Sequence, residues 1–255
     1  RLYGSGRVGV SMAKWQGYIQ EPNDLYADIS SPGAYLGGHA VGIIAVDLVY
    51  PKLPGNVANA TTFDFPVLYK KVSFEIEQLF SGDPALEKMI VDAAKELVAD
   101  GARAIIGACG YFAHFQKQVA AAVDVPVFLS SLVQVPLIQI GLRPEQKILV
   151  LCASGDDMNR EFLAKVNANL DDCIIQDVGS MESFAPIRWG KTELDNRRLS
   201  KDLAELALSV VSEHPEIGAI LLECSDLPPY ACDIQRATGL PVYDFISLIN
   251  WVEHA

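Results

Sequence analysis

The sequence predicts an α/β protein made of two similar units, each built on a parallel sheet. Three observations point to this fold class. The chain has 255 residues and is 50% hydrophobic, which is enough for two domains of about 130 residues each. Short apolar runs alternate with stretches of helical periodicity, as they do in parallel sheets with crossover helices. The order of these elements in the first half then recurs in the second half.

The first unit is expected to follow an extended N-terminal arm at residues 1–40, which is rich in glycine and weakly patterned. The apolar run 41–51 is typical of a buried strand and ends at Pro51. A loop dense in turn residues follows it. The other predicted elements of this unit are a strand at 67–76, a helix at 86–97, a strand at 102–108, a helix at 114–123, a short strand at 125–131 and a helix at 132–142.

The second unit repeats this order from residue 146. Its predicted elements are a strand at 146–155, a helix at 156–170, a strand at 173–179, a loop containing Arg188 and Lys191, a helix at 199–211, a strand at 217–223, a helix at 231–237, a short strand at 240–244 and a final helix that runs to the C-terminus. In both units a strand leads to a cysteine, then to a helix, then to a short strand with the pattern V-P-V or L-P-V. This correspondence indicates an approximate internal duplication.

Charge and hydropathy exclude several classes of partner. Lysine and arginine total 20 against 32 aspartates and glutamates, a net charge of −12, which argues against binding to nucleic acid or to an anionic membrane surface. A small anionic substrate remains compatible, because it responds to local donors. The most apolar stretch, 123–142, contains an aspartate, two prolines and several polar residues, so we expect a strand and a buried helix there and no membrane span.

The cysteines indicate a reducing compartment. There are five of them, at positions 109, 152, 173, 224 and 232, and they form neither a CxxC pair nor a cysteine–histidine cluster with zinc spacing. We therefore expect no structural metal and a cytoplasmic protein. Because the sequence starts at Arg1, a targeting segment removed from the N-terminus stays open.

Two of the cysteines occupy equivalent places in the two units. Cys109, in "GACGYF", and Cys224, in "LLECSDLPPYA", each follow a predicted strand and precede a predicted helix. The carboxyl ends of parallel strands face the ligand crevice. The small residues around Cys109 allow a ligand to approach the backbone, and a helix N-terminus would bind a carboxylate and lower the pKa of a thiol.

A pseudo-twofold relation would place these two thiols on opposite sides of one substrate. One thiolate would then remove a proton from the carbon next to a carboxylate, while the other thiol returned a proton to the opposite face. The alternative is that the cysteines only pack, since free cysteine is often buried as a small hydrophobe. Cys152, Cys173 and Cys232 fit that description.

Taken together, the two cysteine motifs resemble those of the aspartate/glutamate/hydantoin racemase superfamily. The resemblance covers most of residues 41–255. It implies two Rossmann-like domains related by a pseudo-twofold axis, a cofactor-free active site in the cleft between them, catalytic roles for Cys109 and Cys224, and a tendency to form homodimers or larger homo-oligomers. It also implies that the final helix packs back on the first domain. The domains would then comprise 41–131 plus 243–255, and 132–242.

Three features depart from the usual racemase pattern. Gly110 and Tyr111 replace the usual Asn-Thr after the first cysteine, and Ser225 replaces the threonine after the second. The loop "YPKLPGNVANATTFDFPVLYKKV", together with Glu223 directly before Cys224, is similar to the algal dimethylsulfoniopropionate lyase branch of the superfamily. The resemblance to that branch implies removal of a proton α to a carboxylate and expulsion of dimethyl sulfide from the β carbon.

Several other residues are candidates for the site, each with a structural alternative. Glu223 is expected to tune Cys224 or to transfer a proton, or else to be a satisfied buried carboxylate. The candidates for substrate binding are Asp47, Asn56, Tyr69, Gly110, Tyr111, Ser130 and Ser225. Asp47, Ser130, Ser131, Ser225 and Asp226 are equally suited to capping, and Pro228 to a first helical turn. His114 is expected to be a partly exposed helical residue, and Arg188 and Lys191 to belong to a solvated loop.

From the sequence we therefore predict cofactor-independent proton transfer by two cysteines at the carbon α to the carboxylate of a small substrate. A racemase or epimerase of an acidic amino acid or a related carboxylate is the first choice. The alternative is a lyase-type β-elimination on a substrate such as dimethylsulfoniopropionate. Decarboxylation of a malonate and simple carboxylate binding without catalysis are the remaining readings. Nucleotide binding is disfavoured, because no glycine-rich phosphate loop is present.

Overall fold

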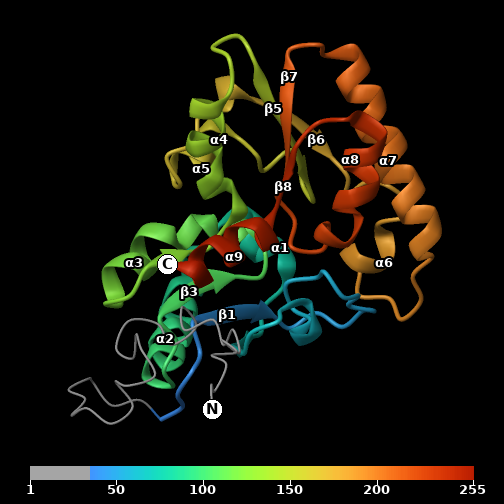
Figure 1. Ribbon diagram of the computed structural model, residues 1–255. Coiled ribbons are helices and arrows are strands. Elements are labelled where there is room, and N and C mark those ends of the chain that lie inside the picture. Colours follow the sequence, from blue (N-terminus) through green and yellow to red (C-terminus); the bar gives the residue numbers. More distant parts are fainter. Residues whose placement is uncertain (1–34) are drawn as a thin grey trace, which may run out of the picture.

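The computed structural model describes residues 35–255 and contains two four-stranded sheets, both fully parallel (Figure 1). The strand order in the first sheet is β2-β1-β3-β4, and in the second it is β6-β5-β7-β8. Both the predicted fold class and the duplication are therefore confirmed. Residues 1–34 of the predicted N-terminal arm lie outside the described residues, and 35–40 form neither helix nor strand.

The strands are the apolar runs of the sequence. Their bounds are β1 Val41–Val46, β2 Val67–Val72, β3 Ala104–Gly107, β4 Val127–Phe128, β5 Lys147–Cys152, β6 Cys173–Asp177, β7 Ile217–Leu222 and β8 Val242–Tyr243. The central strands β3 and β7 are buried along their whole length, as expected for parallel strands covered on both faces by helices. Their carboxyl ends lead directly to Cys109 and Cys224.

Helices cover the faces of both sheets. Their bounds are α1 Ile76–Ser81, α2 Glu87–Ala99, α3 Gln116–Ala122, α4 Val135–Gly141, α5 Arg160–Ala164, α6 Ala185–Arg188, α7 Asn196–Glu213, α8 Ala231–Thr238 and α9 Phe245–His254. None of the helices found in residues 35–255 is both long and apolar enough to cross a membrane.

Several local predictions are wrong in extent. The strand predicted at 41–51 ends at Val46, and the one predicted at 125–131 is reduced to Val127–Phe128. The strand predicted at 67–76 ends at Val72, and α1 starts at Ile76, where Glu75 and Gln78 form a capping box. The helix predicted at 114–123 is split into a 3₁₀ helix at Gly110–Phe115 and α3. The helix predicted at 156–170 is reduced to α5 and is followed by a turn in which Asn167 has a φ of 60°. The predicted loop around residue 188 contains α6.

The C-terminal helix returns to the first sheet. In Figure 1, α9 lies over the first sheet near β3, away from the helices α7 and α8 that precede it in the chain. Its buried residues Phe245, Leu248 and Ile249 share a core with Val41 and Ile43 of β1. This is the crossing that the superfamily resemblance implied. The residue boundaries proposed for the two domains stay a prediction.

The two halves also pack on each other through aromatic side chains. Tyr111 and His114 follow β3 in the first half, and both rings contact Phe162 of α5, with ring centroids 5.3 Å and 4.5 Å apart. These residues are part of, or border, a core that is continuous across both sheets. The carboxyl ends of β3 and β7 therefore meet at a tightly packed junction.

Candidate active site

The two cysteine motifs lie directly against each other. The hydroxyl of Ser225 donates a hydrogen bond to the backbone oxygen of Ala108 over 2.9 Å, so the residue after one cysteine binds the residue before the other. The backbone N–H of Val57, in the loop that follows β1, donates to the oxygen of Ser225 over 3.2 Å. Three segments that are far apart in the sequence therefore meet beside the thiols.

The two thiols differ in accessibility and in their partners. Cys109 is half-buried, whereas Cys224 is only 6% exposed. The thiol of Cys224 donates to Oδ2 of Asp226 over 3.4 Å. Cys109 has no such carboxylate partner; the backbone N–H of Tyr111 lies against its sulfur. The two sides of the junction are thus chemically unequal, although the strands that bring the cysteines there are equivalent.

Both thiols are held in the protonated form. Burial raises the pKa of Cys109 well above its ordinary value, and Glu223 adds to the rise; the N–H of Tyr111 and the charge of Arg188 oppose it. Burial likewise raises the pKa of Cys224, and Asp226, Glu223 and Cys109 add to the rise, which places all three near that thiol. The predicted lowering by helix N-termini is therefore wrong, because burial and two carboxyl groups outweigh the backbone donors of short 3₁₀ turns.

Glu223 is a fully buried carboxyl group whose oxygens complete no hydrogen bond. Its exposed fraction is 0%. Burial raises its pKa from the ordinary 4.5 to about 8; the nearby backbone N–H of Ala153 moderates the rise, and Asp226 increases it. A carboxyl group with a pKa near neutrality can give or take a proton at low cost, which favours a role in proton transfer. No completed side-chain hydrogen bond supports the alternative of a satisfied carboxylate.

Asp226 is the centre of a hydrogen-bond network that connects the two halves. The Tyr50 hydroxyl and the Asn56 amide both donate to its Oδ1, while the thiol of Cys224 donates to Oδ2. Burial raises the pKa of Asp226, and the donors from Tyr50, Asn56 and Cys224 limit the rise. Asp226 was expected to cap a helix, but its carboxylate is occupied by this network and makes no cap contact. Pro228 does start the 3₁₀ helix Pro228–Tyr230, as predicted.

Four predicted site residues are held by contacts to backbone groups. Asn56 also accepts from the N–H of Ala58 over 2.8 Å, in addition to its bond to Asp226. Tyr69, on β2, donates to the oxygen of Val57 over 2.8 Å. Ser130 accepts from the N–H of Leu132 over 3.2 Å and so caps a 3₁₀ helix. Ser225 makes the bond to Ala108 described above and is not a helix cap.

The side chains of two further candidates are engaged by other groups. Asp47 is exposed; its carboxylate accepts from the hydroxyl of Ser73 over 2.7 Å and pairs with Lys71 over 3.0 Å. The hydroxyl of Tyr111 points to the second half, where it donates to the oxygen of Ser154 over 2.5 Å and accepts from its N–H over 3.0 Å. Gly110 lies against the carboxyl group of Glu223.

Sequence reasoning missed Tyr50 and misplaced Arg188 and Asp226. Arg188 was expected in a solvated loop, but its side chain is only 14% exposed and lies over the rings of Phe80 and Trp189. Tyr50 stands in the loop that carries the lyase-like pattern, and that likeness was the available signal. His114 is half-buried: its Nε2 lies 3.0 Å from the oxygen of Phe80, and burial lowers its pKa.

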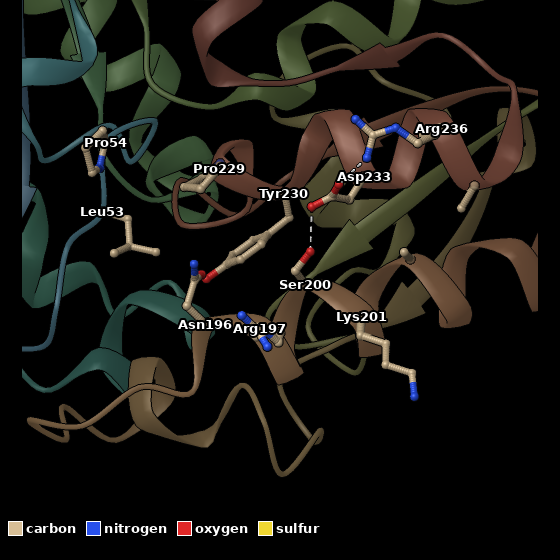
Figure 2. A pocket seen from close by; sticks show the side chains of 12 residues that line it. Leu53, Pro54, Asn196, Arg197, Ser200, Lys201, Pro229, Tyr230, Asp233 and Arg236 are labelled. Atoms are coloured by element: carbon tan, nitrogen blue, oxygen red, sulfur yellow. Dashed lines mark hydrogen bonds and ion pairs between the residues drawn. The ribbon is translucent and has the colours of Figure 1, made fainter.

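A groove of about 730 Å³ opens next to this network (Figure 2). Leu53 and Pro54 form one side of it, and residues of α7 and α8 form the other; Figure 2 shows Tyr230 between them. Tyr230 lies near Asp226, whose charge adds to the effect of burial in raising the pKa of the tyrosine. Neither cysteine lines the groove. The groove thus borders the thiol junction without containing it.

Comparison with known proteins gave relatives in sequence and in structure. No family model matches the chain. It is 33% identical over 216 residues to a dimethylsulfoniopropionate lyase of Durusdinium sp. clade D, covering 81% of this chain and 71% of that one. It is 31% identical over 223 residues to dimethylsulfoniopropionate lyase 3 of Emiliania huxleyi (strain CCMP1516), of which it spans 58%.

The structural neighbours share the fold. Unliganded arylmalonate decarboxylase matches with a TM-score of 0.53 and 18% identity, covering 84% of this chain and 90% of the other. Glutamate racemase RacE1 from Bacillus anthracis matches with a TM-score of 0.54 and 14% identity, covering 85% and 82%. At these identities the likeness establishes a common architecture.

Proposed function

The chain belongs to the family of the dimethylsulfoniopropionate lyases, and on this basis we propose that it catalyses β-elimination on dimethylsulfoniopropionate or a closely related zwitterion. This membership confirms the resemblance to the algal lyase branch, and the structural neighbours confirm the fold that the resemblance to the racemase superfamily implied. In the proposed reaction a base takes the proton α to the carboxylate. The electron pair of that C–H bond forms the C=C bond of acrylate, and the β C–S bond breaks to release neutral dimethyl sulfide.

The main observation in support of this proposal is that two acidic residues, Glu223 and Asp226, lie beside the thiols. Glu223 and Asp226 both raise the pKa of Cys109 and of Cys224, so the site is unfavourable for additional negative charge. Aspartate and glutamate would each bring a second carboxylate into it. A sulfonium zwitterion brings a cation instead, and this cation would lower the pKa of the neighbouring thiol when the substrate binds.

Cys224 is the better placed of the two thiols to act as the base. Its thiol already donates to Asp226, whose carboxylate is held in place by Tyr50 and Asn56. Asp226 would take the thiol proton as the cationic substrate arrives, and the resulting thiolate would remove the α-proton. Elimination needs one base only, because dimethyl sulfide leaves without a proton. Cys109 and Glu223 would then face the other side of the reacting carbon.

Racemisation or epimerisation, the first choice from sequence, is the second candidate. The observation in its favour is that both cysteines stand at equivalent strand ends and close together, as a two-base reaction requires. The unequal partners of the two thiols favour elimination, since a racemase must work in both directions and gains from two similar bases.

Headspace gas chromatography over the purified chain with dimethylsulfoniopropionate tests the proposal. We expect dimethyl sulfide to form at a rate proportional to protein concentration and to disappear after thiol alkylation. In parallel, circular dichroism of L-aspartate and L-glutamate measures racemisation. Loss of optical activity without dimethyl sulfide formation would reject elimination in favour of the second candidate. No change with any substrate would favour carboxylate binding without catalysis.

A further inference from the structure

The positively charged guanidinium of Arg188 lies between the two halves of the protein. It is the last residue of α6 in the second half, yet its Nη1 lies 3.2 Å from Oε1 of Glu77 on α1 in the first half. The carbon at the centre of its guanidinium lies 4.4 Å from the ring centroid of Phe80 and 4.9 Å from that of Trp189. Two aromatic faces therefore hold the planar group in place.

The guanidinium has unused hydrogen-bonding capacity. Nη1 is buried but completes no hydrogen bond, because its N–H groups are not aligned with Glu77 despite the short distance. Glu77 is itself 56% exposed, so the ion pair is of the weak, solvent-screened kind. A buried donor without a partner is costly and uncommon in a folded protein. A ligand that supplied the missing acceptor would remove that cost.

Unsatisfied buried polar atoms occur in the segments that follow strands of the second sheet. Within residues 35–255, six buried side-chain atoms have no hydrogen-bond partner, and four of them belong to Ser183, Arg188 and Glu223. Ser183 and Arg188 come after the carboxyl end of β6, and Glu223 comes directly after β7. Ligands of parallel α/β sheets bind beyond these strand ends. The unmet donors and acceptors thus belong to segments that follow strand ends, the part of such folds where ligands bind.

The cation is on the Cys109 side of the junction. Phe80, on which the guanidinium lies, also packs against the ring of Tyr111 with centroids 4.4 Å apart, and Tyr111 is two residues after Cys109. The charge of Arg188 accordingly opposes the rise that burial and Glu223 cause in the pKa of Cys109. On the other side, Cys224 is bonded to the carboxylate of Asp226. The junction therefore has the cation of Arg188 on the Cys109 side and the carboxylate of Asp226 on the Cys224 side, where Lys52 is near enough to lower the pKa of Asp226.

We propose that Arg188 binds the carboxylate of the substrate, so that the sulfonium group of a zwitterion faces Asp226. This inference deepens the proposed function and rests on it. When the α-proton leaves, negative charge spreads onto the carboxylate oxygens, and a guanidinium at that position stabilises it more strongly than it stabilises the substrate. Arg188 would thus determine the direction in which a zwitterion binds as well as its affinity.

Protection of Cys109 from alkylation measures this binding without requiring turnover. The probe is sodium propionate, which has the carboxylate and chain length of the substrate but no leaving group. The rate of iodoacetamide labelling at Cys109 is followed by peptide mass spectrometry, which separates it from labelling at the exposed Cys232. Sodium chloride at the same ionic strength serves as the salt control. The variants are Arg188→Gln and Arg188→Lys, with Arg198→Gln as a matched control in a surface ion pair with Glu182.

We expect propionate to protect Cys109 in the wild-type chain and in Arg198→Gln. In Arg188→Gln the half-protecting concentration should rise roughly 10- to 100-fold, the loss expected for a charge-assisted hydrogen bond. The half-protecting concentration for Arg188→Lys should lie between those of the wild type and Arg188→Gln, because lysine keeps the positive charge but lacks the paired N–H donors of a guanidinium. If Arg188→Gln does not fold, Arg188→Lys alone carries the test. Equal protection in the wild type and in a folded Arg188 variant would overturn the proposal.

The lyase function and the role of Arg188 can be rejected independently of each other. If the wild type releases no dimethyl sulfide but propionate protection depends on Arg188, the lyase function is wrong and the carboxylate site stands. If the wild type is a lyase and Arg188→Gln keeps its KM and kcat for dimethylsulfoniopropionate, the function stands and the role of Arg188 is wrong.

Discussion

Gly110 and Glu223 are in contact across the junction between the two halves. A Cβ atom on residue 110 would lie 1.9 Å from Oε1 of Glu223 and 2.7 Å from its backbone oxygen. Both distances are far below any normal carbon–oxygen contact, so only glycine fits at residue 110. The absence of one side chain after the first cysteine therefore makes room for the buried carboxyl group that precedes the second.

Replacing Gly110 should disrupt this contact. We expect Gly110→Ala to lower the free energy of unfolding by about 1–3 kcal/mol or more, because the backbone of Glu223 must move as well as its side chain. Gly141→Ala is the matched control, since nothing lies within 4 Å of a Cβ there and α4 ends at that residue. It should be neutral or stabilising by up to about 1 kcal/mol. Urea denaturation of both variants checks this; equal stability would contradict the contact.

Glu223→Gln should reveal the cost of the buried carboxyl group as a dependence of stability on pH. The pKa of Glu223 is raised to about 8, so the folded state keeps the proton that the unfolded state loses near 4.5. Wild-type stability relative to the variant is therefore highest at low pH and falls as the pH rises from about 4.5 to about 8. Over this pH range the difference in free energy of unfolding between the wild type and Glu223→Gln should change by on the order of 4 kcal/mol.

Urea denaturation at pH 5 and pH 8 measures this difference. Glu205→Gln is the control, because Glu205 is exposed and pairs only with Lys201, over 3.7 Å. The free energy of unfolding of Glu205→Gln should stay within about 0.5 kcal/mol of the wild-type value at both pH values. A pH-independent difference between the wild type and Glu223→Gln would show that the carboxyl group is not protonated in the fold.

Asp226→Asn should change reactivity and turnover in opposite directions. Removing the negative charge lowers the pKa of Cys224, so methyl methanethiosulfonate should label this thiol faster at a given pH. Turnover should fall roughly 100-fold or more, since the acceptor for the thiol proton is lost. Asp233→Asn is the control, because Asp233 binds Ser200 and Arg236 beside the groove. Slower labelling of Cys224 in a folded Asp226→Asn variant would contradict the proposed role.

Tyr111→Phe should affect stability more than substrate binding. The hydroxyl is engaged on both sides by Ser154, and its loss leaves a carbonyl and an N–H without partners. We expect the free energy of unfolding to fall by about 1–3 kcal/mol, with KM nearly unchanged. An increase of tenfold in KM at unaltered stability would instead place the hydroxyl on the substrate, as the sequence-based hypothesis has it.

The fold was predictable because apolar runs and helical periodicity are local. The run 41–51 and the repeat that begins at residue 146 indicate β1 and β5 without knowledge of any tertiary contact. The placement of Cys109 and Cys224 follows from the same patterns. The extent of α5 did not, because the turn at Asn167 is a backbone conformation that composition does not reveal.

The partners within the site were less predictable, since they come from distant segments. Tyr50 and Asp226 are 176 residues apart, and only the packed fold brings them together. The direction of the thiol pKa shifts was missed because burial, their largest cause, comes from the packing of distant segments. The carboxyl groups that add to the rise, Glu223 and Asp226, are sequence neighbours of Cys224, but only the fold brings them near Cys109. The sequence around Arg188 predicts a solvated loop, because the aromatic residue that it packs on, Phe80, belongs to the other half of the chain.

Proton NMR of dimethylsulfoniopropionate in deuterium oxide is the most direct test of the central claim, with the wild-type chain, Cys224→Ser and Cys109→Ser. We predict acrylate and dimethyl sulfide in equal amounts from the wild type, a loss of at least about 100-fold in Cys224→Ser, and a smaller loss in Cys109→Ser. If the wild type exchanges the α-protons of aspartate or glutamate and forms no acrylate, or if Cys224→Ser keeps full activity, the account is contradicted.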